Sequence, residues 1–272
     1  MKDHIINEDH LQREGLTAKR VSITEFHKSL GHLISPKEPR RIQTMQLQEV
    51  CDRFDGILQQ KNLNVKEYEV LYRSVYAPTV KYILQGSSLN EKALYEVAKS
   101  NKHKFLQSLR YSKTMAGEIV TGSPTLGGLG FMDLYVEQGL LNLQLLTKAL
   151  SDRQLVGDVT RLTIRKWKWQ LGTGNDPFQE SQHHYPQDES QWLQSVRKFA
   201  VQYHIRLSTS GQDHPLQRVN DRYIMEWAEE MGFSHFELRF LNHCRLYLNV
   251  ISISDITNEL GKSIDPEFMT ST

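Results

Sequence analysis

The sequence predicts a mainly α-helical protein, and three observations lead to that fold class. Apolar residues recur three and four positions apart along most of the chain, as on the buried face of an amphipathic helix. Four residue pairs with capping-box spacing precede such stripes: Asn64 and Glu67, Ser88 and Glu91, Asp188 and Gln191, and Ser234 and Glu237. Strand-like alternation is limited to a short stretch near the start and to residues 205–207, so we expect a short N-terminal β stub followed by helices.

The first part of the chain divides into an arm, the β stub and two helices. Residues 1–20 are polar and mixed in charge, which predicts a flexible arm, and residues 21–36 alternate before they stop at Ser35-Pro36. A charged linker follows, and then the first helical stripe, formed by Leu47, Val50, Cys51, Phe54, Ile57 and Leu58. A second helix is expected from Asn64, with a kink or break at Pro78.

Further helices are predicted downstream from apolar stripes bounded by caps and glycines. We expect them at about 88–109, 132–150, 155–171, 192–203, 220–231 and 234–249. The clearest loop is 172–190, which is the best candidate for a boundary between two halves of the chain.

Composition excludes several classes of protein. Among 272 residues, 39% are hydrophobic and 24% are charged, which is typical of a globular protein and excludes a disordered or collagen-like chain. Two distant cysteines, Cys51 and Cys244, exclude a disulfide scaffold and a structural zinc site. No signal peptide or membrane-spanning stretch is evident, so we expect an intracellular protein, cytoplasmic or nuclear, without a membrane partner.

Charge is distributed unevenly, although the formal net charge is only +1. Between Lys92 and Lys113 six basic residues face one acid, and a second basic cluster at 161–168 is interleaved with Trp167 and Trp169. From Asp213 onward five basic residues face ten acids. Any attraction to a polyanion must therefore be local to the middle of the chain.

Residues that could carry catalysis or bind a metal do not form a recognisable motif. TLGGLG (Thr125–Gly130) lacks the Lys-Ser/Thr of a phosphate loop and the spacing of a dinucleotide fingerprint, which favours a tight turn that leads into a helix. A phosphate at the helix N-terminus is the alternative. His183-His184 has no further ligand at suitable spacing, and Cys51 lies on an apolar stripe. The sequence therefore predicts no catalytic or metal site.

Each basic cluster has two interpretations. A lysine-rich helix face is usually only solvated, whereas Arg and Lys alternating with Trp suit phosphates and stacked bases. One or both of Trp167 and Trp169 could instead be buried on the inward face of a helix.

Several segments together resemble the reverse transcriptases of non-LTR (LINE-like) retrotransposons. HKSLGHLISP (27–36) resembles the strand-turn motif after the polymerase palm that helps to grip the primer end. IVTGSPTLGGLGFMDLYVEQG (119–139) resembles the GGLG segment that follows the thumb. Further similar segments occur in the expected order, at 72–84, 219–233 and 241–256, so the resemblance covers about residues 21–268.

This resemblance implies a thumb and post-thumb segment of an RNA-directed DNA polymerase. Residues 21–36 would end the palm, 37–150 would form a thumb-like helical domain, and 151–272 would form a post-thumb helical region. The palm of this family holds metal ions with paired aspartates, and no Asp-Asp pair occurs in this chain. We therefore assign no catalytic residue and no cofactor here, and expect Mg²⁺ only with the missing palm.

On this interpretation the chain holds RNA, an RNA/DNA hybrid or DNA through backbone phosphates, next to a polymerase palm in a longer protein. The residues expected to contact phosphates are Lys99, Lys102, Lys104, Arg110, Lys113, Arg165, Lys166 and Lys168. Trp167 or Trp169 would stack on a base, and Leu30 and Gly31 would shape the primer-grip turn. The alternative is a structural or protein-interaction helical module, a retroelement remnant whose basic residues are merely solvated.

Overall fold

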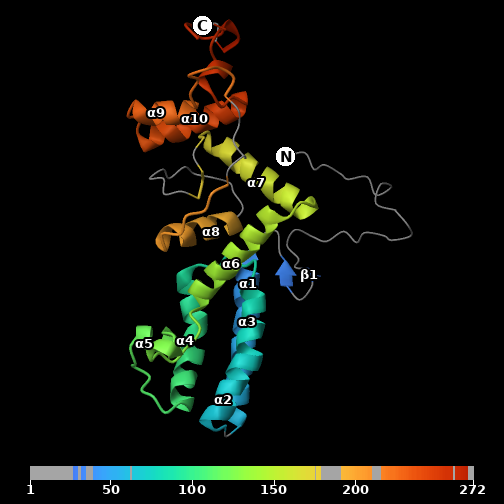
Figure 1. The fold of residues 1–272 in the computed structure, drawn as a ribbon, viewed down its shortest axis with the longest axis vertical. Coiled ribbons are helices and arrows are strands. Elements are labelled where there is room, and N and C mark those ends of the chain that lie inside the picture. Colours follow the sequence, from blue (N-terminus) through green and yellow to red (C-terminus); the bar gives the residue numbers. More distant parts are fainter. Residues whose placement is uncertain are drawn as a thin grey trace, which may run out of the picture. The chain divides into compact units, whose positions relative to one another are not determined.

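The computed structural model describes residues 27–29, 32–34, 39–61, 63–174, 176–178, 191–209, 216–259 and 261–268. This part of the chain is mainly helical, as predicted (Figure 1). The chain forms two compact units: unit 1 spans 1–83 and 91–132, and unit 2 spans 84–90 and 133–272.

Unit 1 is built around helices close to the predicted ranges, except that the last of them, α5, was not predicted. They are α1 (Pro39–Gln60), α2 (Val65–Leu71), α3 (Ala77–Leu84), α4 (Glu91–Ser108) and the short α5 (Gly117–Thr121). α1 and α4 pack against each other (Figure 1). Their core is a cluster of buried rings with centroids 4.5 to 6.5 Å apart: Phe54, Tyr68, Tyr72, Tyr76, Phe105 and Phe131.

Just before Pro78, where a kink or break is predicted, a π-helical turn, Tyr72–Tyr76, separates α2 from α3. Proline has no N–H to donate, so a carbonyl one turn earlier must find another partner. In the wider turn, hydrogen bonds span five residues instead of four: the N–H of Ala77 donates to the carbonyl of Tyr72. Thr79 Oγ1 donates to the Val75 carbonyl at 2.7 Å, which satisfies another exposed acceptor.

Of the four predicted capping boxes, two form, one does not, and the fourth begins at Asp188, which lies outside the described residues. Asn64 with Glu67 and Ser234 with Glu237 exchange side-chain and backbone hydrogen bonds at the starts of α2 and α10. α4 begins only at Glu91, three residues after Ser88, which is buried in the preceding loop. Tertiary burial of that loop overrides the local capping signal.

Before α1 the structure describes two three-residue segments, β1 (His27–Ser29) and β2 (His32–Ile34), paired antiparallel. The remainder of the predicted β stub, including the primer-grip residues Leu30 and Gly31, and the predicted arm lie outside the described residues. The β stub and its place at the end of a palm therefore stay predictions.

Unit 2 contains α6 (Leu134–Ser151), α7 (Leu155–Leu171), α8 (Gln191–Gln202), α9 (Ile224–Glu230) and α10 (His235–Leu248). α6 packs with α7 and α8 around a core that includes Leu146, Ile164, Trp167 and Phe199. The sequence assigned residues up to 150 to the first helical domain. The structure corrects that boundary, because α6 belongs to unit 2.

Two amides on α6 explain why the loop at 84–90 also belongs to unit 2. Gln138 accepts from the Leu89 N–H at 3.1 Å and donates to the Leu89 carbonyl at 2.9 Å. Asn142 accepts from the Gly86 N–H at 2.9 Å and donates to the Ser87 carbonyl at 2.8 Å. Both amides are 1% exposed. They therefore supply the hydrogen bonds that water would otherwise make to the buried backbone N–H and C=O groups of this loop.

Candidate nucleic-acid interface

The basic residues of α4 divide among different faces of the helix. The buried face of α4 consists of Leu94, Val97, Asn101, Phe105 and Leu106. Lys92 and Lys99 are exposed on the opposite face, and Lys102 is half-buried. The Lys102 amine lies beside Gly117 of α5, since a Cβ built there would be 3.8 Å from Nζ. The charge cluster seen in the sequence is therefore not one continuous surface.

The side chain of Lys104 points toward a buried carboxylate in unit 1, that of Asp55. Its Nζ lies 2.7 Å from Asp55 Oδ2, and the Asp55 side chain is only 6% exposed. Ser100 donates to the same carboxylate at 2.8 Å, and Asn101 Nδ2 donates to it as well. A carboxylate buried between α1 and α4 needs such partners to offset its lost hydration. The expectation that Lys104 contacts phosphate is therefore corrected: its charge neutralises Asp55.

Arg110 and Lys113 are exposed just beyond the end of α4. Arg110 has a φ of 62°, and its N–H donates to Gln107 while the next N–H donates to Leu106. These two bonds form a Schellman-type C-cap, a position where glycine is usual. Both cations face solvent, as the phosphate-binding hypothesis requires, but the structure does not test their role.

The second predicted basic cluster lies on α7, and two of its residues, Trp167 and Lys168, are buried in unit 2. Trp167 is 1% exposed and packs edge-on against Phe178, with ring centroids 5.3 Å apart. Lys168 is 2% exposed, and its Nζ donates to the Thr209 carbonyl at 3.5 Å. The structure thus corrects both expectations, because neither side chain can reach a base or a phosphate. The reason is helical phase: residues 164, 167, 168 and 171 share the inward face.

Three residues of that cluster keep some exposure. Arg165 and Lys166 are exposed. Trp169 is half-buried, and the guanidinium of Arg245 lies 5.8 Å from the centroid of its ring. That cation already occupies one face of the indole, which leaves it less suited to stack on a base.

One surface on unit 1 combines cations with an exposed aromatic ring, and we call it the α4 strip: Lys92, Tyr95, Lys99 and Lys102. Tyr95 is 58% exposed. The spacing of i, i+3, i+7 and i+10 places the four residues along one side of the helix. None of these lysines forms an ion pair with another residue in the described part of the chain. Two exposed acids of α4, Glu91 and Glu96, border this side of the helix.

Sequence analysis did not include Tyr95 or Lys92 among the candidate site residues. Tyr95 and Lys92 lie four and seven positions before Lys99, which is the spacing of residues on one side of a helix. Choosing this side as the exposed one required knowing which face of α4 is buried.

The glycine-rich segment is a tight turn, as predicted. Gly127 and Gly130 adopt φ values of 85° and 68°, which favour glycine. A Cβ at Gly128 would overlap the backbone of Gly122, so the chain segments on the two sides of the turn approach closely. The alternative of a phosphate at the following helix is not favoured, because Asp133 caps α6 by accepting from Tyr135 and Val136.

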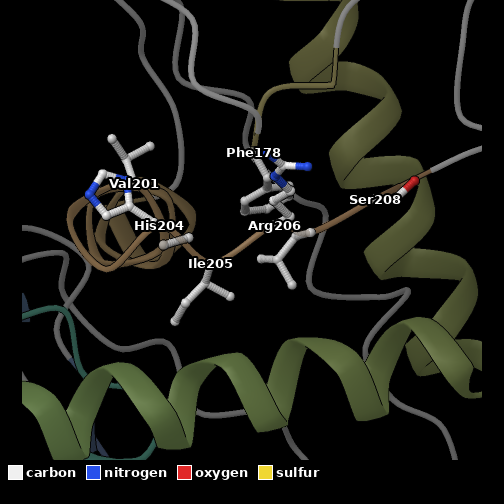
Figure 2. Close-up of a pocket in the computed structure, with 8 residues that line it drawn as sticks. Phe178, Val201, His204, Ile205, Arg206 and Ser208 are labelled. Atoms are coloured by element: carbon white, nitrogen blue, oxygen red, sulfur yellow. The ribbon is translucent and has the colours of Figure 1, made fainter.

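Neither of two cavities among the described residues holds a recognisable catalytic arrangement. In unit 1 a cavity of about 290 Å³ lies between the aromatic cluster and the glycine-rich segment, with Tyr68, Tyr111 and Leu129 among its lining residues. In unit 2 a cavity of about 590 Å³ lies at the end of α8 (Figure 2). Figure 2 shows His204 and Ser208 at opposite ends of the row that lines it, so they form no nucleophile–base pair.

Cys51 is buried as expected and is chemically quiet. Burial raises the pKa of its thiol to about 11, although a hydrogen bond with Tyr76 opposes that rise. Its sulfur lies 3.6 Å from the Tyr76 hydroxyl, whose pKa is also raised by burial. A thiol that keeps its proton is a poor nucleophile.

Within the described residues, no group of three His, Cys, Asp or Glu side chains is arranged to hold a metal ion. None of the helices in that part of the chain is long and apolar enough to cross a membrane. Comparisons with models of known protein families, with curated proteins and with solved structures give no match for this chain. The function must therefore be argued from the residues themselves.

Proposed function

We propose that the chain is a non-catalytic thumb and post-thumb segment of a retroelement RNA-directed DNA polymerase. In this role, unit 1 binds nucleic acid by its phosphates through the α4 strip. The observation that supports this proposal is the side-by-side placement of three lysines and a 58% exposed tyrosine on α4. The strip extends over ten residues, which is about 15 Å along a helix. This length reaches two or three phosphates of one strand.

The size of the effect follows from the number of charges. If the three lysines neutralise two to three phosphates, the slope of log affinity against log salt is about −1.8 to −2.7 on a duplex. Affinity should then fall roughly 12- to 42-fold between about 50 and 200 mM salt. Tyr95 adds a flat ring on which an unpaired base can stack.

The test is charge reversal on the strip, measured by fluorescence anisotropy with a labelled RNA/DNA hybrid. Lys99→Glu with Lys102→Glu should weaken binding at least tenfold and flatten the salt slope by about 2. The matched control is Lys148→Glu with Lys198→Glu, which makes the same change in net charge at exposed helical positions of unit 2. Equal losses in both double variants, or none in the strip variant, would refute the assignment.

The alternative, a protein-interaction helical module, is favoured by a different observation. The first half of α7 presents Leu155, Val159 and Leu162 to solvent, with exposed fractions of 75%, 53% and 63%. Exposed apolar residues gathered on one helix face are typical of interaction surfaces. Retention on heparin at about 0.15 M salt separates the two functions, since an interaction module without a phosphate-binding surface would not be retained.

A further inference from the structure

The strongest surface feature outside the α4 strip is a row of rings on α10. Phe236, Phe240, His243 and Tyr247 are all exposed, and the three large rings have exposed fractions of 79%, 66% and 91%. The opposite side of α10 is buried, through Leu238, Asn242 and Arg245, where the helix packs with α9 and the end of α7 (Figure 1). We call the exposed row the α10 aromatic row. Large rings in this number are rarely left in water.

The spacing of this row is that of a helix-pairing seam. Its members are separated by four, three and four residues, which is the repeat of alternating a and d positions in a coiled coil. The pattern is symmetric about its own centre, between Leu241 and Asn242. A two-fold axis at that centre would place Phe236 opposite Tyr247 of a second copy, and Phe240 opposite His243 of that copy. Every ring would then face a ring.

We propose that the α10 aromatic row is a self-association surface, through which two copies of this chain pair their α10 helices antiparallel. Such an isologous contact closes on itself and leaves no open edge. No member of the row is an acid, a lysine or an arginine. The exposed charged neighbours, Glu237 and Arg239, lie to either side of the row on the helix, so pairing along the row buries no carboxylate.

Area and charge favour a second copy over other occupants. At the exposed fractions above, the three rings present about 500 Å² per copy, or about 1,000 Å² for the pair, at the low end of specific interfaces. A nucleic acid stacked on the row is disfavoured, because the exposed charges beside it, Glu237 and Arg239, cancel each other and leave no basic surface for phosphates. We therefore expect a weak dimer, with a Kd on the order of 10 to 100 μM.

The first test is sedimentation velocity on the full chain, from about 1 μM to about 200 μM. The expected result is a monomer–dimer equilibrium that persists at high salt, since the contact is apolar. Phe240→Glu should weaken it at least 100-fold, because each dimer would bury two carboxylates. Leu162→Glu on the exposed face of α7 is the control and should leave it unchanged. A monomer throughout, a dimer lost only in Leu162→Glu, or a dimer indifferent to Phe240→Glu would overturn the proposal.

A second test reads the direction of pairing, in a Cys244→Ser background. A mixture of Phe236→Cys and Tyr247→Cys chains should form a mixed disulfide under mild oxidation, whereas Phe236→Cys alone should not. Preferential linkage of Phe236→Cys to itself would mean parallel pairing and would overturn the antiparallel arrangement.

Discussion

Gln138 offers the sharpest test of what attaches the loop at 84–90 to the rest of unit 2. The substitution Gln138→Leu keeps a side chain of similar size on α6 but removes both amide groups. The N–H and C=O of Leu89 then lose their partners at a site that is buried. The Ser87 hydroxyl loses a contact of 2.6 Å, but it retains the Leu84 carbonyl as acceptor.

The expected cost follows from these two backbone groups. An unsatisfied buried donor or acceptor costs about 1–3 kcal/mol, so we expect a loss of about 3 kcal/mol in the free energy of unfolding of unit 2. The control is Gln144→Leu, the same substitution on the exposed side of the same helix, which should change stability by less than about 0.5 kcal/mol.

Tryptophan fluorescence is the natural assay for this comparison. The chain has four tryptophans, Trp167, Trp169, Trp192 and Trp227, and all lie within the residues of unit 2. Urea unfolding followed by this signal therefore reports on unit 2 alone. Equal midpoints for Gln138→Leu and Gln144→Leu would refute the claim that the amide holds the loop.

Three further substitutions follow from backbone strain, packing and ionisation. Arg110→Gly should stabilise unit 1 by about 1 kcal/mol in urea unfolding followed by circular dichroism, because glycine adopts a φ of 62° without penalty. Gly139→Ala should destabilise unit 2 by about 1–3 kcal/mol in the fluorescence assay, because the added methyl would overlap the ring of buried Phe199. The raised pKa of Cys51, about 11 against an ordinary 9.0, contributes stability that is complete below pH 9 and is lost between pH 9 and 11. That loss should reach at most about 3 kcal/mol, and Cys51→Ala should reduce the fall measured over this range.

Each of these predictions has a clear contrary result. An unchanged or lowered stability in Arg110→Gly would show that the arginine is not strained at the end of α4. A neutral Gly139→Ala would mean that Phe199 moves aside without cost. If Cys51→Ala loses stability with pH as steeply as the parent chain, the dependence arises elsewhere, for example from Tyr68 and Tyr76, whose pKa values burial also raises.

Local signals in the sequence were sufficient for most of the helices. The range of α7 was predicted to the residue, and α6, α8 and α10 within about two residues, because apolar spacing and helix ends depend on neighbours within one or two turns. The positive φ values of Gly127 and Gly130 were predictable for the same reason. Prediction failed at Ser88, where a buried loop altered the local preference, and it missed the short helix α5 and the π-helical form of the turn before Pro78.

The candidate interface was only partly predictable. Basic residues near α4 and α7 were visible in the sequence, but their partners were not. Asp55 lies 49 positions before Lys104, and Thr209 lies 41 positions after Lys168. Composition cannot distinguish a lysine that neutralises a buried carboxylate from one that faces solvent.

The sequence by itself determined the fold class, the helices and the uneven distribution of charge, because each depends on residue type and short-range spacing. The tertiary structure alone decided which cations remain available, which tryptophan is buried and where the two units divide. The α6 amides of Gln138 and Asn142 bind a loop about 50 residues earlier, and that pairing moves both the loop and α6 into unit 2. Such contacts depend on how helices pack in three dimensions, and a buried polar group accepts whichever partner the packing brings within hydrogen-bond distance.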